Sequence, residues 1–275
     1  MTVTNAVETT MIWGTVSGAS MVGMVISLLL SVVLPIFLGI FIYKKTKAWV
    51  PAFFIGCGIF VGFAMILEQI CHAIVLTVTG SAIRDNIWLY AIYGGLAAAL
   101  FEECGRWIAM TFCLKKHLTR ENALMYGAGH GGIEAFLILG MSSMSNLLTA
   151  AMINGGLMEK TMTALEPAQQ EVTYHQLSVL WTTPAYQFYL APVERISAIA
   201  LQIALSILVY SAVKTGRKLH LAAAFGLHFA VDFLTVICAA AIPTWALELG
   251  LLLVVAVICV VVYKLVYLSL AEKKV

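Results

Sequence analysis

The sequence carries little charge for its length. Only 11% of its 275 residues are Asp, Glu, Lys or Arg, whereas 61% are hydrophobic. Soluble globular proteins contain roughly 25% charged residues. A soluble fold of this size could not hide so much apolar surface, so the composition indicates a protein that has the bilayer as its solvent. The net charge of +2 is too small to predict binding to nucleic acid.

Cysteine pairs and the motifs of common hydrolases are also scarce. The six cysteines lie in or beside apolar segments and none forms a CxxC pair, so we expect packing residues and no disulfide framework. No HExxH, GxSxG, P-loop or dinucleotide fingerprint occurs. The first residues are polar, with Glu8 as their only charge, and so predict no cleavable signal peptide.

Long apolar runs follow one another along almost the whole chain. Runs of about 20 residues or more predict transmembrane helices. We therefore expect residues 1–275 to form a single integral membrane domain, an all-α bundle with about seven spans. The predicted spans are 11–43, 50–78, 87–114, 123–153, 186–213, 221–242 and 245–268. The first is long and is compatible with an interfacial start, and the polar loop 155–185 is expected to hold a short helix near 174–181.

Basic residues are concentrated in alternate connections. They follow spans one, three, five and seven, as Lys44, Lys45, Lys47, Lys115, Lys116, Arg120, Lys214, Arg217, Lys218, Lys273 and Lys274. The intervening loops hold only Arg84 and Lys160. Because basic loops stay on the cytoplasmic side, the pattern predicts an outside N-terminus, a cytoplasmic C-terminus and an extracytoplasmic 155–185 loop.

Ionisable side chains recur inside the predicted spans, although each costs roughly 2.5–3.5 kcal/mol at the centre of a membrane. They are Glu68, His72, Glu102, Glu103, Arg106, His130, Glu134, Glu194, Arg195, His228 and Asp232. At about 1.5 Å per residue, both His130 and His228 lie roughly 13 Å, and the two adjacent glutamates roughly 18 Å, from the cytoplasmic ends of their helices. The sequence therefore predicts one polar zone in the cytoplasmic half of the bilayer.

The spacing of these residues suggests how they pair. Glu134 and Asp232 each follow a histidine by four residues, and so share a helix face with it. Arg106 can pair with either Glu102 or Glu103. A carboxylate beside a histidine can activate water, stabilise an oxyanion or bind a metal. The alternative for each pair is a structural ion pair or an interhelical hydrogen bond, which is favoured for Glu68–His72 and weighs about evenly for Glu194–Arg195.

Three motifs in order carry a resemblance to a known family. They are E-E-x-x-R at 102–106, G-H-G-G-x-E at 129–134 and H-x-x-x-D at 228–232. The ordered set resembles the YhfC family of bacterial membrane proteins, which is grouped with the CAAX-prenyl proteases, PrsW and the Aph subunit of γ-secretase. The resemblance covers most of the chain.

The resemblance implies an intramembrane endopeptidase of a bacterial-type plasma membrane that cleaves a membrane-associated peptide or protein. Glu102 or Glu103 and His130 would activate water, while His228 and Asp232 would stabilise the oxyanion or complete a metal site. Supporting roles would fall to Arg106, Glu134 and Glu194. The additional carboxylate of Glu134 makes His130, Glu134 and His228, with a glutamate of the first motif, a credible set of ligands for a divalent metal such as zinc.

Two functions of other classes use the same residues. Buried carboxylates and histidines could form the relay of a proton- or metal-coupled transporter. The chain shows no inverted repeat, which counts against that class. A non-catalytic membrane scaffold is the other alternative, and it predicts that the motif residues are replaceable.

Overall fold

The computed structural model describes residues 11–270, and every regular element in that range is helical. Seven helical segments are long and apolar enough to cross a membrane, at 18–46, 51–79, 87–113, 120–154, 185–215, 218–239 and 244–267. The predicted all-α, multi-pass architecture is confirmed, with ends that agree to within a few residues for all spans but the first. Lys273 and Lys274 lie outside the described residues.

Several spans are composed of more than one helical element. The first span is α1 (Gly18–Thr46), and the second joins α2 (Pro51–Phe60), the π-helix η1 (Val61–Glu68) and α3 (Gln69–Thr79). The third joins α4 (Ile87–Ile108) to η2 (Ala109–Cys113), and η3 (Lys115–His117) follows it. The fourth joins α5 (Arg120–Ala135), η4 (Phe136–Gly140) and α6 (Met141–Asn154). The last three are α9 (Ala185–Thr215), α10 (Lys218–Ala239), and α11 (Thr244–Val262) with η5 (Tyr263–Tyr267).

The first span is shorter than the sequence predicts, because its helix begins at Gly18 and the prediction of a start at Met11 was wrong. The side chain of Ser17 caps the helix by accepting a hydrogen bond from the Ser20 amide. Residues 11–17 precede the helix without regular structure, and the amide of Val16 donates to the side chain of Asn154 at 2.8 Å. Asn154 in turn donates to the Val16 carbonyl at 3.0 Å. These bonds satisfy the backbone outside a helix.

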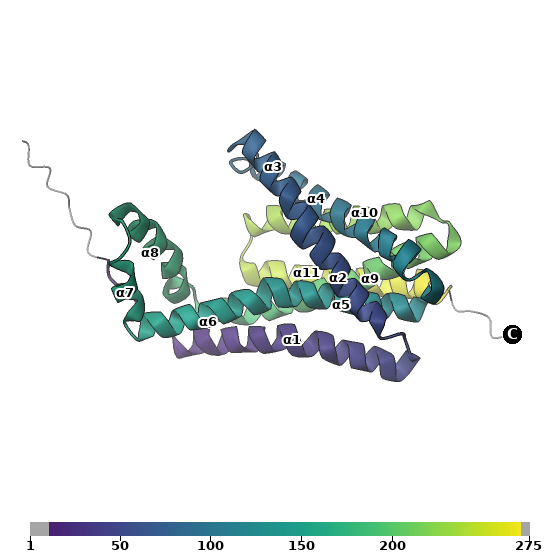
Figure 1. The fold of residues 1–275 in the computed structure, drawn as a ribbon, viewed down its shortest axis with the longest axis horizontal. Helices are drawn as coiled ribbons and strands as arrows, with labels where there is room; N and C mark the ends of the chain where they lie inside the picture. The colour runs from purple at the N-terminus through teal and green to yellow at the C-terminus, as the bar shows by residue number, and fades with distance from the viewer. Residues whose placement is uncertain (1–10, 271–275) are drawn as a thin grey trace, which may run out of the picture.

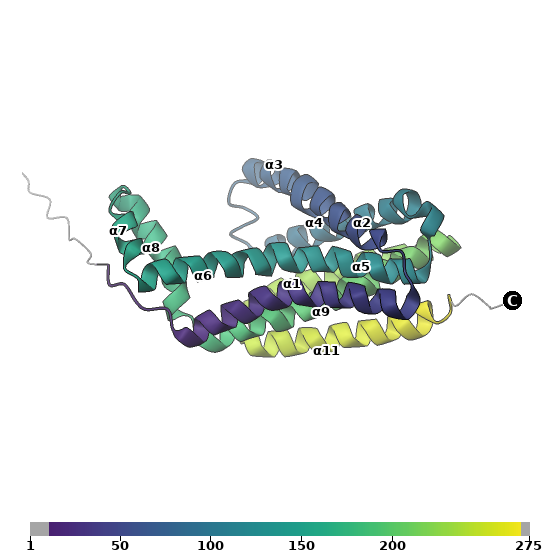
Figure 2. The same ribbon diagram turned by 60° about the horizontal axis from the view of Figure 1, so that its bottom comes forward.

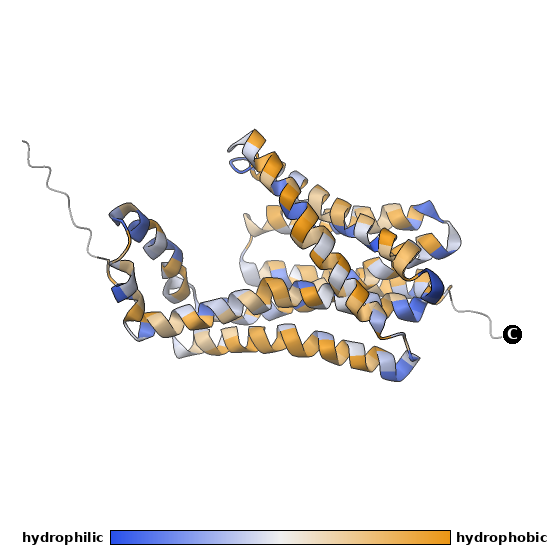
Figure 3. Ribbon diagram, in the orientation of Figure 1, coloured by the Kyte–Doolittle hydropathy of each residue, from blue (hydrophilic) through white to orange (hydrophobic). Residues whose placement is uncertain are grey.

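The connections of the bundle alternate between its two ends. Those that follow α1, η2 and α9, which carry the basic residues, lie together at the right-hand end of Figure 1. The polar 155–185 segment lies at the opposite end and forms two short helices, α7 (Leu157–Met162) and α8 (Pro167–Thr182), the second of which contains the predicted helix. In Figure 3 the hydrophilic residues gather at the helix ends and in α7 and α8.

The span α9 is the centre of the bundle. Within its most apolar stretch 72% of the residues are buried, against 33% or less in each of the other spans. Helices α1, α5, α10 and α11 all pack against it, and Figure 2 shows it running between α1 and α11. Helix α4 packs on α10 and α2 packs on α5. A polar side chain in the middle of α9 can therefore reach several other helices at once.

Candidate active site

The predicted polar zone exists, and four helices build it. Helix α4 contributes Glu102, Glu103 and Arg106, α5 contributes His130 and Glu134, α9 contributes Arg195 and Gln202, and α10 contributes His228 and Asp232. The side chains at its centre are almost fully shielded, since Arg106 and His130 are each 0% exposed and Glu103 is 2% exposed. Such groups require partners because burying an unpaired charge is very costly.

Direct contact between the backbones of α2 and α5 fixes the position of His130. A Cβ added to Gly129 would lie 1.9 Å from the carbonyl oxygen of Phe53. A Cβ added to Gly56 would lie 2.2 Å from the carbonyl oxygen of Tyr126 and 2.8 Å from the His130 amide. Only glycine allows the two helices to approach so closely. The glycine-rich run of the second motif therefore places the histidine against α4.

The carboxylate of Glu102, on α4, bonds to side chains of two other helices, α5 and α9. Its Oε2 lies 2.9 Å from Nε2 of His130 and 2.9 Å from the side-chain amide nitrogen of Gln202. On the far side of the imidazole ring, the hydroxyl of Tyr126 lies 3.4 Å from Nδ1 of His130. A hydrogen on Nε2 and a tyrosine hydroxyl that donates to Nδ1 satisfy both contacts. The histidine then holds one oxygen of the carboxylate in place.

The two adjacent glutamates have different partners. Glu103 accepts from Nδ1 of His228 at 2.8 Å, whereas Glu102 pairs with His130. The guanidinium of Arg106 lies between the two carboxylates, 3.8 Å from Glu102 and 3.4 Å from Glu103. Both pairings that the spacing allowed are therefore present. Arg106 neutralises part of the charge of the adjacent carboxylates.

The sequence analysis missed Gln202, which organises the site from the central helix. Its amide nitrogen donates to Glu102 at 2.9 Å and to Glu134 at 2.8 Å, and its side-chain oxygen accepts from Arg106. Ionisable residues alone were considered as candidates, so an amide was overlooked. Its position in the middle of an apolar span was the available signal.

A second ion cluster lies beside the first, toward the α7–α8 end of α9. Arg195 donates to Glu134 at 3.1 Å and also to the neighbouring Glu194. The side chain of Glu134 is thereby shared between Arg195 and Gln202, and within the described residues no hydrogen bond or ion pair joins it to either histidine. The predicted supporting role of Glu194 is thus compatible with a structural ion pair. Glu68 bonds to His72 at 3.2 Å, and the other ring nitrogen of His72 lies 2.7 Å from the Tyr93 hydroxyl, so within residues 11–270 neither side chain bonds to the Glu102 cluster.

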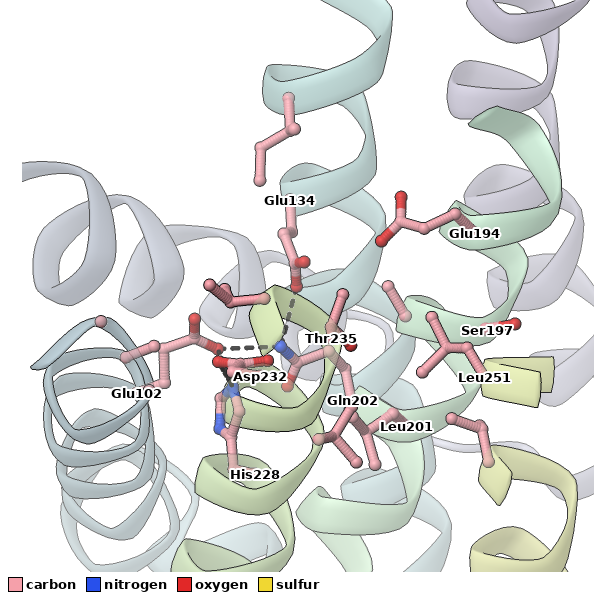
Figure 4. A pocket seen from close by; sticks show the side chains of 18 of the residues that line it. Glu102, Glu134, Glu194, Ser197, Leu201, Gln202, His228, Asp232, Thr235 and Leu251 are labelled. Atoms are coloured by element: carbon pink, nitrogen blue, oxygen red, sulfur yellow. Dashed lines mark hydrogen bonds and ion pairs between the residues drawn. The ribbon is translucent and has the colours of Figure 1, made fainter. Parts of the chain in front are cut away.

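A cavity of about 360 Å³ opens at the centre of these residues, between α4, α5, α9, α10 and α11. Glu102, Gln202, His228 and Asp232 line it, as Figure 4 shows. Nε2 of His228 lies 3.9 Å from Glu102 and 3.6 Å from Asp232, whose side chain is 35% exposed. The cavity therefore presents a carboxylate, an imidazole nitrogen and a second carboxylate to a bound molecule.

Some residues of the site do not line the cavity but contact residues that do. Neither His130 nor Glu103 is among the lining residues, and both contact a residue that is. The sequence left open which of the two glutamates faces the cavity, and in the structure it is Glu102. The fold and this site define a polytopic α-helical membrane protein with a carboxylate–histidine centre enclosed among its spans.

Comparisons with known proteins agree with this class. The model of the family described as YhfC intramembrane metalloprotease matches residues 30–259. An uncharacterized membrane protein, YhfC of Bacillus subtilis (strain 168), is 41% identical over 222 residues, which cover 78% of this chain and 83% of that protein. No solved structure matches the chain significantly. The chain belongs to the YhfC intramembrane metalloprotease family.

The description of the family implies a metal ion, and the donors here can be compared with that requirement. Tetrahedral metal sites of catalytic type use three protein ligands. Nη2 of Arg106 lies 3.3 Å from Nε2 of His130, the atom that a metal would need. Glu134 bonds to Gln202 and Arg195. Within residues 11–270 no group of three or more His, Cys, Asp or Glu side chains is arranged to hold a metal ion. The predicted His130, Glu134 and His228 set does not form a metal site in this arrangement.

Proposed function

We propose that the protein is an intramembrane endopeptidase in which Glu102 activates the attacking water. The position of Glu102 supports this most directly: it lines the cavity while hydrogen bonds from His130 and Gln202 hold its Oε2. All hydrogen bonds that the described part of the chain makes to this carboxylate reach Oε2. Oε1 is therefore available to take a proton from water, as general base catalysis requires.

His228 and Asp232 are suited to stabilise the oxyanion that forms after water attacks the peptide carbonyl. Nε2 of His228 faces the cavity, while Nδ1 of the same ring bonds to Glu103. With both nitrogens protonated, the ring donates to Glu103 and to the oxyanion that forms when water adds to a peptide carbonyl. Asp232 lies beside the same nitrogen and orients the ring. The proton held by Glu102 then passes to the leaving amine, and the new carboxyl and amino ends separate.

The positioning residues have a defined task in this scheme. Hydrogen bonds from His130 and Gln202 restrict Glu102 to one rotamer, and Arg106 balances its charge. A displacement of about 1 Å at a reacting group can cost roughly 100-fold in rate. We therefore assign Glu102, His228 and Asp232 to the chemical step. Gln202 and Glu134, which also line the cavity, support them together with His130, Glu103 and Arg106, which do not line it.

The membership of the family favours this function over a transporter or a scaffold. The test compares membrane proteins from cells that produce the wild type, Glu102→Gln, His130→Ala or Glu68→Gln, with new N-termini identified by terminal-amine labelling and mass spectrometry. We expect new N-termini in or beside apolar segments for the wild type and Glu68→Gln only. The same N-termini in all four samples would exclude a peptidase that uses this site.

A further inference from the structure

A second, apolar hollow lies between α10 and α11. Its volume is about 220 Å³, and its walls include Val231, Leu234 and Cys238 of α10 and Leu247, Gly250 and Val254 of α11. Leu234 is 53% exposed, and a Cβ built on Gly250 meets no atom within 4 Å. The hollow is therefore an open groove on the lipid-facing side of the bundle. We call it the α10–α11 groove.

The groove lies next to the cavity that contains Glu102. Val231, Thr235 and Leu251 line both of them. Asp232, which is adjacent to Val231 in sequence, lines the cavity beside His228. One layer of side chains therefore separates the lipid-facing groove from the polar centre.

The packing of α10 and α11 leaves this side of the bundle open. Of the 22 residues of α10, only Ala224 and His228 are buried, so the part after His228 buries none. The buried positions of α11 are Glu248, Val255 and Val262, and this helix packs chiefly on α9. The two helices are joined by a short connection, at the end of the bundle away from the basic connections. The outer half of α10 is therefore free to separate from α11 at little cost in buried contacts.

We propose that the α10–α11 groove is the lateral gate through which an apolar peptide segment passes from the bilayer to Glu102. The proposal rests on the proposed peptidase function and adds the class of substrate, a membrane-embedded segment, and its route. The outer part of the route has aliphatic walls, which match a peptide that is already dissolved in lipid. A peptide from water would have no need of an apolar passage on the lipid-facing side.

The polar side chains at the inner end of the route favour a peptide over a lipid chain. Asp232, Gln202 and Glu102 line the cavity on the inner side of the wall that it shares with the groove. A hydrocarbon chain would bury these groups without hydrogen-bond partners, which is costly. A peptide that unwinds there loses its helical hydrogen bonds, and the same polar groups can replace them. The arrangement is therefore suited to a segment that is apolar in its side chains and polar in its backbone.

Cys238 allows a direct test, because it lines the groove. The protein carries Glu102→Gln and retains either Cys238 alone or Cys104 alone, the latter being exposed on α4 and absent from the walls of the groove. It is reconstituted in nanodiscs with a synthetic single-span peptide of leucine and alanine that carries one cysteine at successive positions. Disulfide formation under mild oxidation is then measured. The expected result is a several-fold higher yield at Cys238, and equal yields at the two cysteines would overturn the gate.

Blocking variants give an independent check of the same gate. Gly250→Phe fills the groove, whereas Gly226→Phe adds the same ring at an exposed position of α10 that lines neither the groove nor the cavity. We expect the cross-linking yield at Cys238 to fall several-fold with Gly250→Phe and to remain with Gly226→Phe. An unchanged yield with Gly250→Phe would overturn the proposal. Loss of the cross-link at Cys238 because lipid takes the place of the peptide in the groove would also overturn it.

The cross-link does not depend on turnover, so the two hypotheses fail separately. A specific cross-link in a protein whose wild type cleaves nothing would support the gate and contradict the peptidase. Cleavage of membrane-embedded substrates at the wild-type rate by Gly250→Phe would contradict the gate and support the peptidase.

Discussion

Glu102 and His130 stand on different spans, yet Oε2 of the first lies 2.9 Å from Nε2 of the second. Both side chains are buried, and the contact joins α4 to α5 at the edge of the cavity that Glu102, His228 and Asp232 line. The contact accounts for the first two motifs together, because the arginine of the first and the glycines of the second both help to hold it.

Replacement of Gln202 by leucine should reduce cleavage sharply while the protein stays folded. The change removes the donors to Glu102 and Glu134 but keeps a side chain of similar volume. Loss of the restraint on Glu102 is expected to cost roughly 100-fold in initial rate. The measurement is the cleavage rate in proteoliposomes, with Gln187→Leu, at the start of the same helix, as the control. A wild-type rate for Gln202→Leu would show that the amide does not position Glu102.

Gly129→Ala should destabilise the fold. The added methyl group would lie 1.9 Å from the carbonyl of Phe53, so α2 and α5 must move apart. Overpacking of this kind costs about 1–3 kcal/mol or more. Thermal unfolding in detergent should show a lower midpoint for Gly129→Ala. Gly58→Ala, where a Cβ meets nothing within 4 Å, should leave the midpoint unchanged or slightly higher. Equal midpoints for the two variants would mean that α2 and α5 are less closely packed.

Removal of the charge of Arg106 should prevent accumulation of folded protein. Arg106→Gln would leave the carboxylates of Glu102 and Glu103 buried without their shared cation. Loss of one partner of a buried ion pair costs about 3–5 kcal/mol. The fraction of monodisperse protein after extraction measures the effect, with the exposed Arg84→Gln as the control. Well-folded Arg106→Gln at the wild-type yield would contradict this role.

The donor arrangement predicts that the activity does not require a divalent metal bound by His130, Glu134 and His228. Elemental mass spectrometry of the purified protein should find the same metal content in the wild type and in Glu134→Ala. Stoichiometric metal that disappears in both His130→Ala and Glu134→Ala would show that the three side chains rearrange around an ion.

Most of the fold follows from the sequence, because apolar runs and alternate basic connections are one-dimensional signals. The depth of each ionisable residue also follows, since the rise along a helix is constant. Depth correctly grouped Glu102, His130 and His228. It could not give the rotation of each helix about its axis, which decides that Glu102 faces the cavity and Glu103 does not. The same rotation brings Glu134 to Arg195 and Gln202, to which it bonds in place of the histidines with which it was grouped.

The role of Glu102 is tested most directly by the cleavage rates of purified wild type, Glu102→Gln and Glu103→Gln in proteoliposomes that contain one substrate identified from cells. We predict that Glu102→Gln abolishes cleavage because an amide cannot accept the proton of water. Glu103→Gln should retain part of the rate, since the amide oxygen can still accept from Nδ1 of His228. Cleavage by Glu102→Gln at the wild-type rate, or its loss in Glu103→Gln alone, would contradict the account.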